Sequence, residues 1–309
     1  MDSKFQDLER LLDLRGRVAV VTGGGDGIGR GCARILAAAG ASVVVSSLHI
    51  EKAQTPVSLI EADGGRAVPV ACNVLQDSDL QALIDFAKKT FGTVNILINN
   101  AGGGGGGREN PYSIDLDYVR RIYMMNVFAP WQLIKLAAPL MQESGYGSVV
   151  NITSMSSRDR QASMSVYASS KAAFNHMTAN LAHDYGPMGV RINNVGPGAT
   201  RTAALAKVLT PELEHKMLAH TPLGRLGEVD DIARAVLFFA APISGWISGE
   251  TLFVNGGGTQ TLLSSGLSSF LSYRYFCPKA RWASFTICLM RCSSDFGQIS
   301  STSPASATI

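Results

Sequence analysis

The chain of 309 residues has few charges of either sign and only a small excess of positive ones. Charged residues make up 17% of it and hydrophobic residues 46%, whereas a disordered chain shows the reverse balance. The formal net charge of +3 is too small for the concentrated basic surface that neutralises several phosphates. Disorder is therefore excluded for most of the chain, and nucleic acid is not expected as a partner.

Cysteine and metal-binding patterns are also scarce. Five cysteines is an odd number, and no two of them form a Cys-x-x-Cys pair, which argues against a disulfide framework and a zinc knuckle. None of the five histidines stands at metal-ligand spacing from a cysteine. No metal site is predicted, and a reducing compartment is expected.

Long apolar segments are missing as well. The longest run, residues 235–243, contains Pro242 and is far shorter than the ~20 residues that a membrane-spanning helix needs. The first sixteen residues mix charges and lack the apolar core of a signal peptide. We therefore expect a cytoplasmic protein with no membrane span.

Seven short segments rich in valine and isoleucine alternate with longer stretches of helical period. The first six are almost continuously apolar, as parallel strands covered on both faces are, and the intervening segments are long enough for crossover helices. The pattern predicts an α/β fold, a single doubly wound Rossmann-like domain with a seven-stranded, mostly parallel sheet. The predicted strands are residues 18–22, 42–46, 67–71, 95–99, 148–152, 190–195 and 251–254.

The length is compatible with two domains, or with one large domain and an extra segment. Composition changes after Leu262, since residues 263–309 contain twelve serines, one aspartate and no glutamate, without strand or helix period. Residues 1–262 hold 23 basic and 23 acidic residues, so the whole net charge of +3 lies in this tail. We expect one domain at residues 1–262 and a disordered, serine-rich appendage at 263–309.

The first predicted strand runs into a glycine-rich turn, TGGGDGIG, at which a helix begins. A turn without side chains lets the backbone approach a pyrophosphate, whose charge is met by free N–H groups and the helix dipole. The second strand ends in Ser46 and Ser47, where a carboxylate would bond the ribose 2′-hydroxyl of NAD. The missing carboxylate favours NADP(H) slightly over NAD(H). Candidate sources of positive charge are His49, Lys52 and Arg30, although a solvated surface side chain is the favoured interpretation of each.

The fourth predicted strand ends in NNAG and opens into six consecutive glycines, Gly102 to Gly107. A flexible linker between domains is one interpretation of such a run. Its place at the carboxyl end of a sheet strand, where α/β proteins bind ligands, favours a bare lip to a substrate pocket.

Tyr167 and Lys171 stand four residues apart in VYASSKAAFNHM, whose period is helical, so their side chains leave the same face. An adjacent ammonium favours a phenolate, and we expect it to lower the pKa of Tyr167. Such a pair can protonate an alkoxide or deprotonate an alcohol. Ser154 follows the fifth strand and is placed to hydrogen-bond the same substrate oxygen.

Together these elements resemble the short-chain dehydrogenase/reductase family over residues 14–262, in family order and spacing. The resemblance implies that Tyr167 is the general acid/base, that Lys171 holds the nicotinamide ribose, and that Ser154 steadies the substrate oxygen. It also implies that Asn126 bonds a water of the proton relay. The implied cofactor site comprises Thr22, Gly23, Asp26, Gly27, Ile28, Gly29, Ser47, Asn73, Val74, Asn100, Ala101, Gly102, Tyr167, Lys171, Pro197, Gly198 and Thr202.

Within the family, the segments ITSM, YASSKAA, LTPELEHKMLAHTPLGRLG and SGETLFVNGGG resemble bacterial hydroxysteroid dehydrogenases that act at a 7α-hydroxyl. This implies a hydroxysteroid or bile acid substrate and a lid at residues 202–221. The implied substrate site comprises Gly103, Ser154, Met155, Tyr167, Met217 and Leu218.

Two other functions stay open at this point. One is a reductase of 3-oxoacyl thioesters or of another ketone, and the other is a non-catalytic NAD(P)-binding scaffold or sensor. The presence of all four predicted catalytic residues speaks against the second. Family resemblance also implies a homo-oligomer, a tetramer or dimer, built through the helices near residues 117–142 and 165–185.

Overall fold

The computed structural model describes residues 8–104, 109–160 and 162–259. The predicted appendage at 263–309 lies outside the described residues, as do Gly105 to Gly107 of the glycine run.

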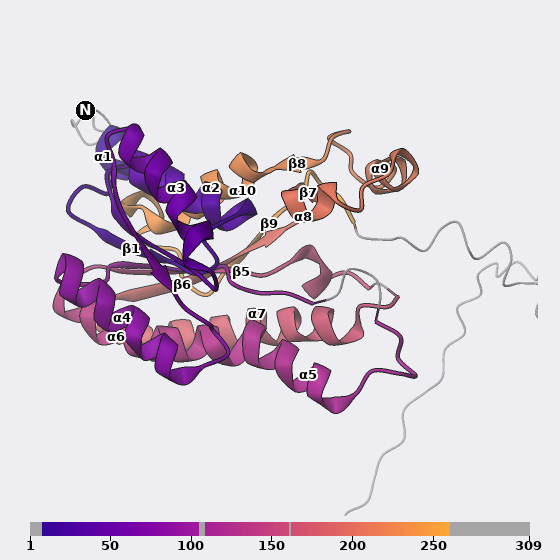
Figure 1. Ribbon diagram of the computed structural model, residues 1–309, viewed down its shortest axis with the longest axis horizontal. Coiled ribbons are helices and arrows are strands. Elements are labelled where there is room, and N and C mark those ends of the chain that lie inside the picture. The colour runs from indigo at the N-terminus through magenta and orange to yellow at the C-terminus, as the bar shows by residue number, and fades with distance from the viewer. Residues whose placement is uncertain (1–7, 105–108, 161, 260–309) are drawn as a thin grey trace, which may run out of the picture. The chain divides into compact units, whose positions relative to one another are not determined.

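Seven parallel strands form one sheet in the order β3-β2-β1-β4-β5-β6-β9, which confirms the predicted fold (Figure 1). The order reverses beside β1, because the chain first adds β2 and β3 on one side and then crosses to β4 on the other. Open α/β sheets bind ligands at the carboxyl ends of the strands next to such a reversal. The strands are β1 (Val18–Val21), β2 (Ser42–Ser47), β3 (Arg66–Ala71), β4 (Ile96–Asn99), β5 (Gly147–Ile152), β6 (Val190–Pro197) and β9 (Thr251–Val254).

Helices cover both faces of the sheet, as the doubly wound pattern requires (Figure 1). One face packs against α2 (Gly27–Ala38), α3 (Ile50–Ala62) and α10 (Val229–Ala240), and the other against α4 (Asp77–Phe91), α6 (Ala129–Glu143) and α7 (Ser165–Tyr185). The short helix α1 (Leu8–Leu12) precedes β1.

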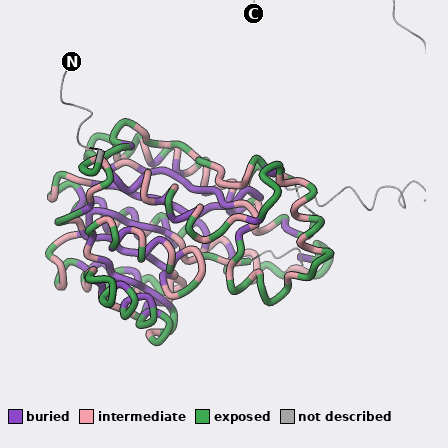
Figure 2. Tube along the Cα trace, turned by 90° about the horizontal axis from the view of Figure 1, so that it is seen from above, coloured by how far each residue is buried: buried purple, intermediate pink, exposed green. Residues whose placement is uncertain are grey.

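Alternate residues of each central strand enter the two cores. Val43 and Val45 of β2 join the first core, whereas Val44 between them joins the second. Figure 2 shows the resulting concentration of buried residues along the sheet. Each fully buried valine, leucine or isoleucine contributes roughly 1.5–3 kcal/mol, so these two cores hold the strand ends rigidly in place.

Two segments at the carboxyl edge depart from the regular alternation. Between β6 and α10 the chain forms β7 (Thr200–Arg201), α8 (Ala203–Ala206), α9 (Pro211–Leu218) and β8 (Gly227–Glu228), where β7 pairs with β8. Neither α8 nor α9 has a fully buried residue. The second segment is α5 (Leu116–Tyr123), which continues into α6 through a π-helical turn, η2 (Met124–Phe128).

Three short 3-10 segments complete the described fold: η3 (Met155–Ser157) after β5, η4 (Gly186–Met188) after α7, and η5 (Pro242–Ser244) after α10. None of the helices in the described part of the chain is both long and apolar enough to cross a membrane.

Candidate active site

The glycine-rich turn joins β1 to α2 with a backbone that only glycine adopts without strain. Gly23 and Gly27 have φ values of +61° and +50°. A Cβ on Gly29 would stand 2.2 Å from the Gly23 carbonyl oxygen, so no side chain fits there. Asp26 caps α2 by accepting a hydrogen bond from the Gly27 amide at 2.7 Å. The bare turn at a helix N-terminus fits the pyrophosphate of a dinucleotide, and Ile28 lies in the first turn of that helix.

Asn100 and Thr22 tie this turn to the end of β4. The Asn100 side-chain amide donates to the carbonyl oxygens of Thr22 and Gly23, both at 3.0 Å. The Thr22 hydroxyl accepts from the amides of Asn100 and Ala101, also at 3.0 Å each. Asn100, which we expect in the cofactor site, therefore also braces the glycine turn through its own hydrogen bonds.

Gly102 lies where Asn126 and Lys171 come together. A Cβ on Gly102 would meet Asn126 Oδ1 at 2.9 Å and Lys171 Nζ at 3.2 Å. Asn126 is only 1% exposed, and its side chain binds both the amide and the carbonyl of Gly103 at 3.1 and 2.9 Å. It also donates to the Ser170 hydroxyl at 3.0 Å. The π-helical turn η2 places Asn126 between the glycine segment and α7, an arrangement often found at functional sites.

Tyr167 and Lys171 lie on the same helix, α7, as their spacing predicts. Lys171 is buried, and its ammonium donates to the Ile152 carbonyl oxygen at the end of β5, at 2.8 Å. That ammonium lies 6.0 Å from the centre of the Tyr167 ring. Ser154 caps η3 by accepting from the Ser156 amide at 3.1 Å. Its hydroxyl also acts on the Tyr167 phenol, whose pKa it lowers. The structure thus gathers Asn126, Ser154, Tyr167 and Lys171 from η2, the segment after β5, and α7.

Burial controls the titration of this group. It raises the pKa of Tyr167 above its ordinary value, while the Ser154 hydrogen bond acts in the opposite direction. Burial also lowers the pKa of Lys171 to about 8. The sequence-based expectation that Lys171 lowers the pKa of Tyr167 is therefore wrong for the protein alone, because burial of the phenol raises this pKa and Lys171 is not among the groups that shift it. The phenol is protonated at neutral pH and is able to donate.

The lowered pKa of Lys171 predicts how the free energy of unfolding depends on pH. The ordinary value is 10.5, so between about pH 8 and that value the folded protein binds fewer protons than the unfolded chain. The free energy of unfolding should accordingly rise with pH across this window, relative to a Lys171→Met variant, by up to about 3 kcal/mol. Urea unfolding at pH 7.5 and at pH 10 measures this change in both proteins. Subtracting the Lys171→Met value from the wild-type value cancels the titration of all other groups. If the free energy of unfolding changed with pH equally in both proteins, the pKa of Lys171 would not be lowered by burial.

The residues expected around the adenosine lie at the carboxyl ends of β2 and β3. Ser47 is the last residue of β2 and is 8% exposed. Asn73 and Val74 follow β3 and are partly buried, and the Asn73 amide donates to Asp79 at 2.9 Å. The turn also contacts α3, since a Cβ on Gly25 would meet Lys52 Cβ at 2.9 Å. No carboxylate occupies position 47.

On the opposite side of the glycine turn lies the end of β6. Pro197 ends the strand and is buried, and Gly198 follows it beside Met155, with 3.4 Å between a Cβ on Gly198 and Met155 Sδ. Thr202 caps α8 by accepting from the Leu205 amide at 3.2 Å. Its methyl group would lie 3.6 Å from a Cβ on Gly27. The start of the expected lid therefore adjoins the turn that we expect to hold the pyrophosphate.

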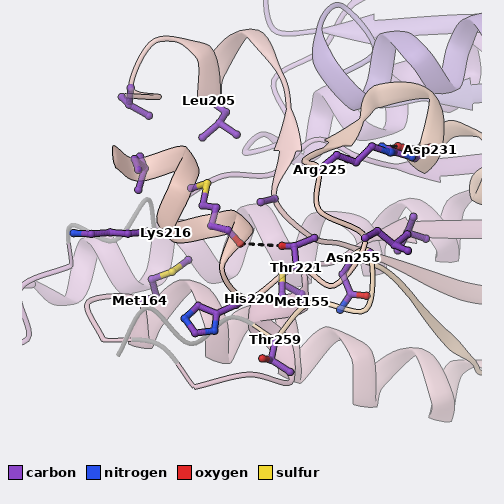
Figure 3. Close-up of a pocket in the computed structure, with 18 of the residues that line it drawn as sticks. Met155, Met164, Leu205, Lys216, His220, Thr221, Arg225, Asp231, Asn255 and Thr259 are labelled. Carbon is purple, nitrogen blue, oxygen red and sulfur yellow. Dashed lines mark hydrogen bonds and ion pairs between the residues drawn. The ribbon is translucent and has the colours of Figure 1, made fainter. Parts of the chain in front are cut away.

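A cavity of about 440 Å³ opens beneath α8 and α9 (Figure 3). Its lining includes Met155 and Met217, two of the residues expected to contact substrate. Gly103 and Leu218 are not among the described lining residues, and neither are Ser154 and Tyr167. Met155, which follows Ser154, and Met164, three residues before Tyr167, are both in the lining. Other apolar lining residues are Leu205, Val208 and Leu213.

Charged side chains also line this cavity. Arg225 and Arg234 both pair with Asp231, at 2.6 and 3.8 Å. Lys216 of α9 has no ion pair among the described residues. Thr221 is held by the Met217 carbonyl at 2.9 Å, which secures the end of α9 (Figure 3). An apolar cavity that is also lined by cationic side chains suits an amphipathic, anionic molecule.

Sequence reasoning missed two parts of the site. One is a buried chain of side-chain hydrogen bonds below it, in which Asn151 joins Asn99 at 2.8 Å and Asn194 at 3.1 Å. Asparagines inside the otherwise apolar segments SVVNI and VRINNV were the signal. The other is Glu109, which is 4% exposed and reaches α7. No sequence pattern marks it.

Among the described residues no group of histidine, cysteine and acidic side chains could hold a metal ion.

Comparison with known families and proteins gives consistent matches. A family model described as enoyl-(acyl carrier protein) reductase matches residues 23–259. The chain is 45% identical over 251 residues to a 7alpha-hydroxysteroid dehydrogenase of Escherichia coli, covering 81% of this chain and 97% of that protein. It is 36% identical over 245 residues to a 7alpha-hydroxysteroid dehydrogenase of Clostridium sardiniense, covering 79% of this chain and 94% of that one.

Solved structures include a similar protein with ligands bound. It is a 7α-hydroxysteroid dehydrogenase complexed with NADH and 7-oxo glycochenodeoxycholic acid, 45% identical in sequence, with a TM-score of 0.79. The match covers 82% of this chain and 98% of that one. Similarity of this extent spans the sheet, the glycine turn and the α8–α9 segment together.

Proposed function

Because the chain belongs to the short-chain dehydrogenase/reductase family, we propose that it transfers a hydride between a nicotinamide cofactor and a hydroxysteroid or bile acid. The observation that carries this proposal is the 440 Å³ cavity whose lining includes Met155, the residue that follows Ser154. Pockets for compact organic ligands are usually about 300–1,000 Å³ and mainly apolar. The three methionines of the lining, Met155, Met164 and Met217, favour a rigid, apolar ring system, and Lys216 favours an anionic end.

The proposed chemistry divides among the four gathered residues. When bound, the nicotinamide cofactor supplies the hydride for reduction or accepts it in oxidation. Tyr167 donates a proton to the oxygen of the ketone, or removes one from the alcohol, and Ser154 hydrogen-bonds that same oxygen. Lys171 presents its ammonium toward the bare surface of Gly102, where a ribose hydroxyl would accept from it. Asn126 fixes the backbone of Gly103 below the substrate and completes the proton path.

The cofactor site is proposed to comprise the residues around the glycine turn, with NADP(H) preferred to NAD(H). Ser47 leaves the end of β2 without the carboxylate that would repel a 2′-phosphate. Lys52 lies against Gly25 of the turn, and Arg30 is exposed in the first turns of α2, so positive charge is available nearby.

A substrate panel tests the function. We expect the highest kcat/KM for a 7-oxo bile acid, with NADPH severalfold better than NADH, because the cavity is apolar and position 47 carries no charge. Acetoacetyl and enoyl thioesters serve as competing substrates. Faster turnover of either thioester would show that the substrate is an acyl thioester and not a steroid. Strict preference for NADH would overturn the cofactor assignment. A protein that binds NADPH but turns over no ketone would be a scaffold or sensor.

We also propose a cytoplasmic homo-oligomer, a tetramer or dimer. Apolar side chains on the outer surface of α5, η2 and α6 support association, since Leu116, Phe128 and Trp131 are 59%, 48% and 38% exposed. The two described cysteines, Cys32 and Cys72, are buried free thiols, which fits a reducing compartment.

A further inference from the structure

Glu109 is a buried acidic residue that the proposed chemistry does not use. It follows the glycine-rich segment, precedes α5, and is 4% exposed. Long acidic side chains are almost never fully buried unless they are paired. Its surroundings therefore have to explain why a carboxylate is retained there.

Both carboxylate oxygens of Glu109 accept hydrogen bonds, and two of the three donors are backbone amides of α7. Oε2 accepts from the Val166 amide at 2.8 Å, and Oε1 accepts from the Tyr167 amide at 3.1 Å. Oε1 also accepts from the phenol of Tyr118, a residue of α5, at 3.1 Å. One side chain thus joins the loop after the glycines, α5 and the start of α7.

The two amides belong to the first turn of α7, where N–H groups have no acceptor within the helix. Such groups are usually satisfied by the side chain of the residue that precedes the helix. Here that residue is Met164, which makes no capping hydrogen bond. Glu109 does the same work from a distant part of the chain, and its negative charge lies at the positive end of the helix dipole.

The backbone of Glu109 adds a second point of attachment. Its amide donates to the Ser163 carbonyl oxygen at 3.1 Å. Ser163 has a φ of +58° and is the one residue other than glycine with a positive φ in the described ranges. A serine in this conformation is strained and persists only where its surroundings hold it. Glu109 therefore fastens both the strained entry to α7 and the first turn of the helix.

We propose that Glu109 is a positioning residue that fixes Tyr167 in its reactive place by capping α7 from the loop that follows the glycine-rich segment. The inference rests on the proposed role of Tyr167. Tyr167 is itself one of the two capped residues, so a shift of the first turn moves its Cα and phenol relative to Ser154, which lies on the separate segment after β5. Met164, which lines the cavity, precedes the capped turn and moves with it.

Two substitutions of Glu109 test the proposal in the full-length enzyme with saturating cofactor and ketone. Glu109→Ala removes all three acceptors, and kcat is expected to fall roughly tenfold to a hundredfold, as for a reactive group misplaced by about 1 Å. Glu109→Gln keeps one carbonyl oxygen and is expected to recover part of that loss. The KM for the cofactor should stay within twofold in both variants, because the hydrogen bonds of Glu109 to described residues go to Tyr118, Ser163 and the first turn of α7, away from the glycine turn.

Amide hydrogen exchange supplies a readout independent of turnover. Val166 and Tyr167 should lose protection in Glu109→Ala, while amides in the middle of α7 keep theirs. Glu143→Gln is the matched control for Glu109→Gln, because it makes the same chemical change at an exposed site in α6. It should alter neither kcat nor amide exchange.

Specific outcomes would overturn the proposal. One is a wild-type kcat per folded molecule in Glu109→Ala, and another is unchanged exchange at Val166 and Tyr167. If Glu109→Ala does not fold, the proposal is overturned by a Glu109→Gln enzyme that keeps both wild-type kcat and wild-type amide exchange. The proposed function fails separately, through an active Tyr167→Phe enzyme, whatever the behaviour of the Glu109 variants.

Discussion

Replacing Tyr167 by phenylalanine is expected to lower kcat by roughly 10²–10⁴-fold, the usual contribution of a positioned general acid or base. The substitution removes a single oxygen, that of the phenol whose pKa Ser154 lowers. The ring remains within 6.0 Å of the Lys171 ammonium, so packing of α7 against β5 is retained. The loss should therefore appear in kcat with a 7-oxo bile acid, while the dissociation constant for NADPH stays within a few-fold.

Tyr185→Phe is the matched control for this experiment. It makes the same deletion at the far end of the same helix, where the side chain is only partly buried and outside the proposed site. Its kcat is expected to equal that of the wild type. Fluorescence titration with NADPH confirms that each variant still binds cofactor. Steroid turnover that survives undiminished in Tyr167→Phe would show that another group moves the proton.

The fold could be predicted because strand signals and turn signals agree. A segment such as VAVVT is apolar at every position, and such strands are stable only when both faces are covered, which selects a parallel sheet. All seven strands occur within two residues of their predicted bounds. The π-helical turn at Met124–Phe128 had no such signal, since local residues favour an ordinary helix and the contacts of Asn126 with Gly103 and Ser170 are made at long range.

The chemistry was predicted less completely than the fold. The helical spacing of Tyr167 and Lys171 gives the shared helix, but the pKa of each depends on burial, which the spacing does not report. Glu109 lies beside a run of glycines and 57 residues before its amide partner Val166. A contact of that separation is set by the packing of three elements. The substrate and cofactor roles carried over from family resemblance stay predictions.

Gly29→Ala is expected to weaken NADPH binding by about 100-fold or more, although it adds one methyl group. The new Cβ would stand 2.2 Å from the Gly23 carbonyl oxygen and 2.4 Å from Asn100 Nδ2. Neither neighbour can move easily. The Gly23 oxygen belongs to the backbone, and the Asn100 side chain is held by two hydrogen bonds of 3.0 Å. The turn must shift instead, and its amides are the groups that we propose bind the pyrophosphate.

The matched control for this substitution is Gly186→Ala. Gly186 has a helical φ of −53° and no atom within 4 Å of its missing Cβ, so alanine should leave stability unchanged or raise it by about 0.4–1 kcal/mol. In Gly29→Ala, overpacking should cost about 1–3 kcal/mol of unfolding free energy in addition to the loss of cofactor affinity. Calorimetric titration with NADPH and urea unfolding separate the two effects. Wild-type affinity in a folded Gly29→Ala protein would mean that the dinucleotide does not bind at this turn, and the nicotinamide site around Gly102 would then have to be anchored from another part of the sheet edge.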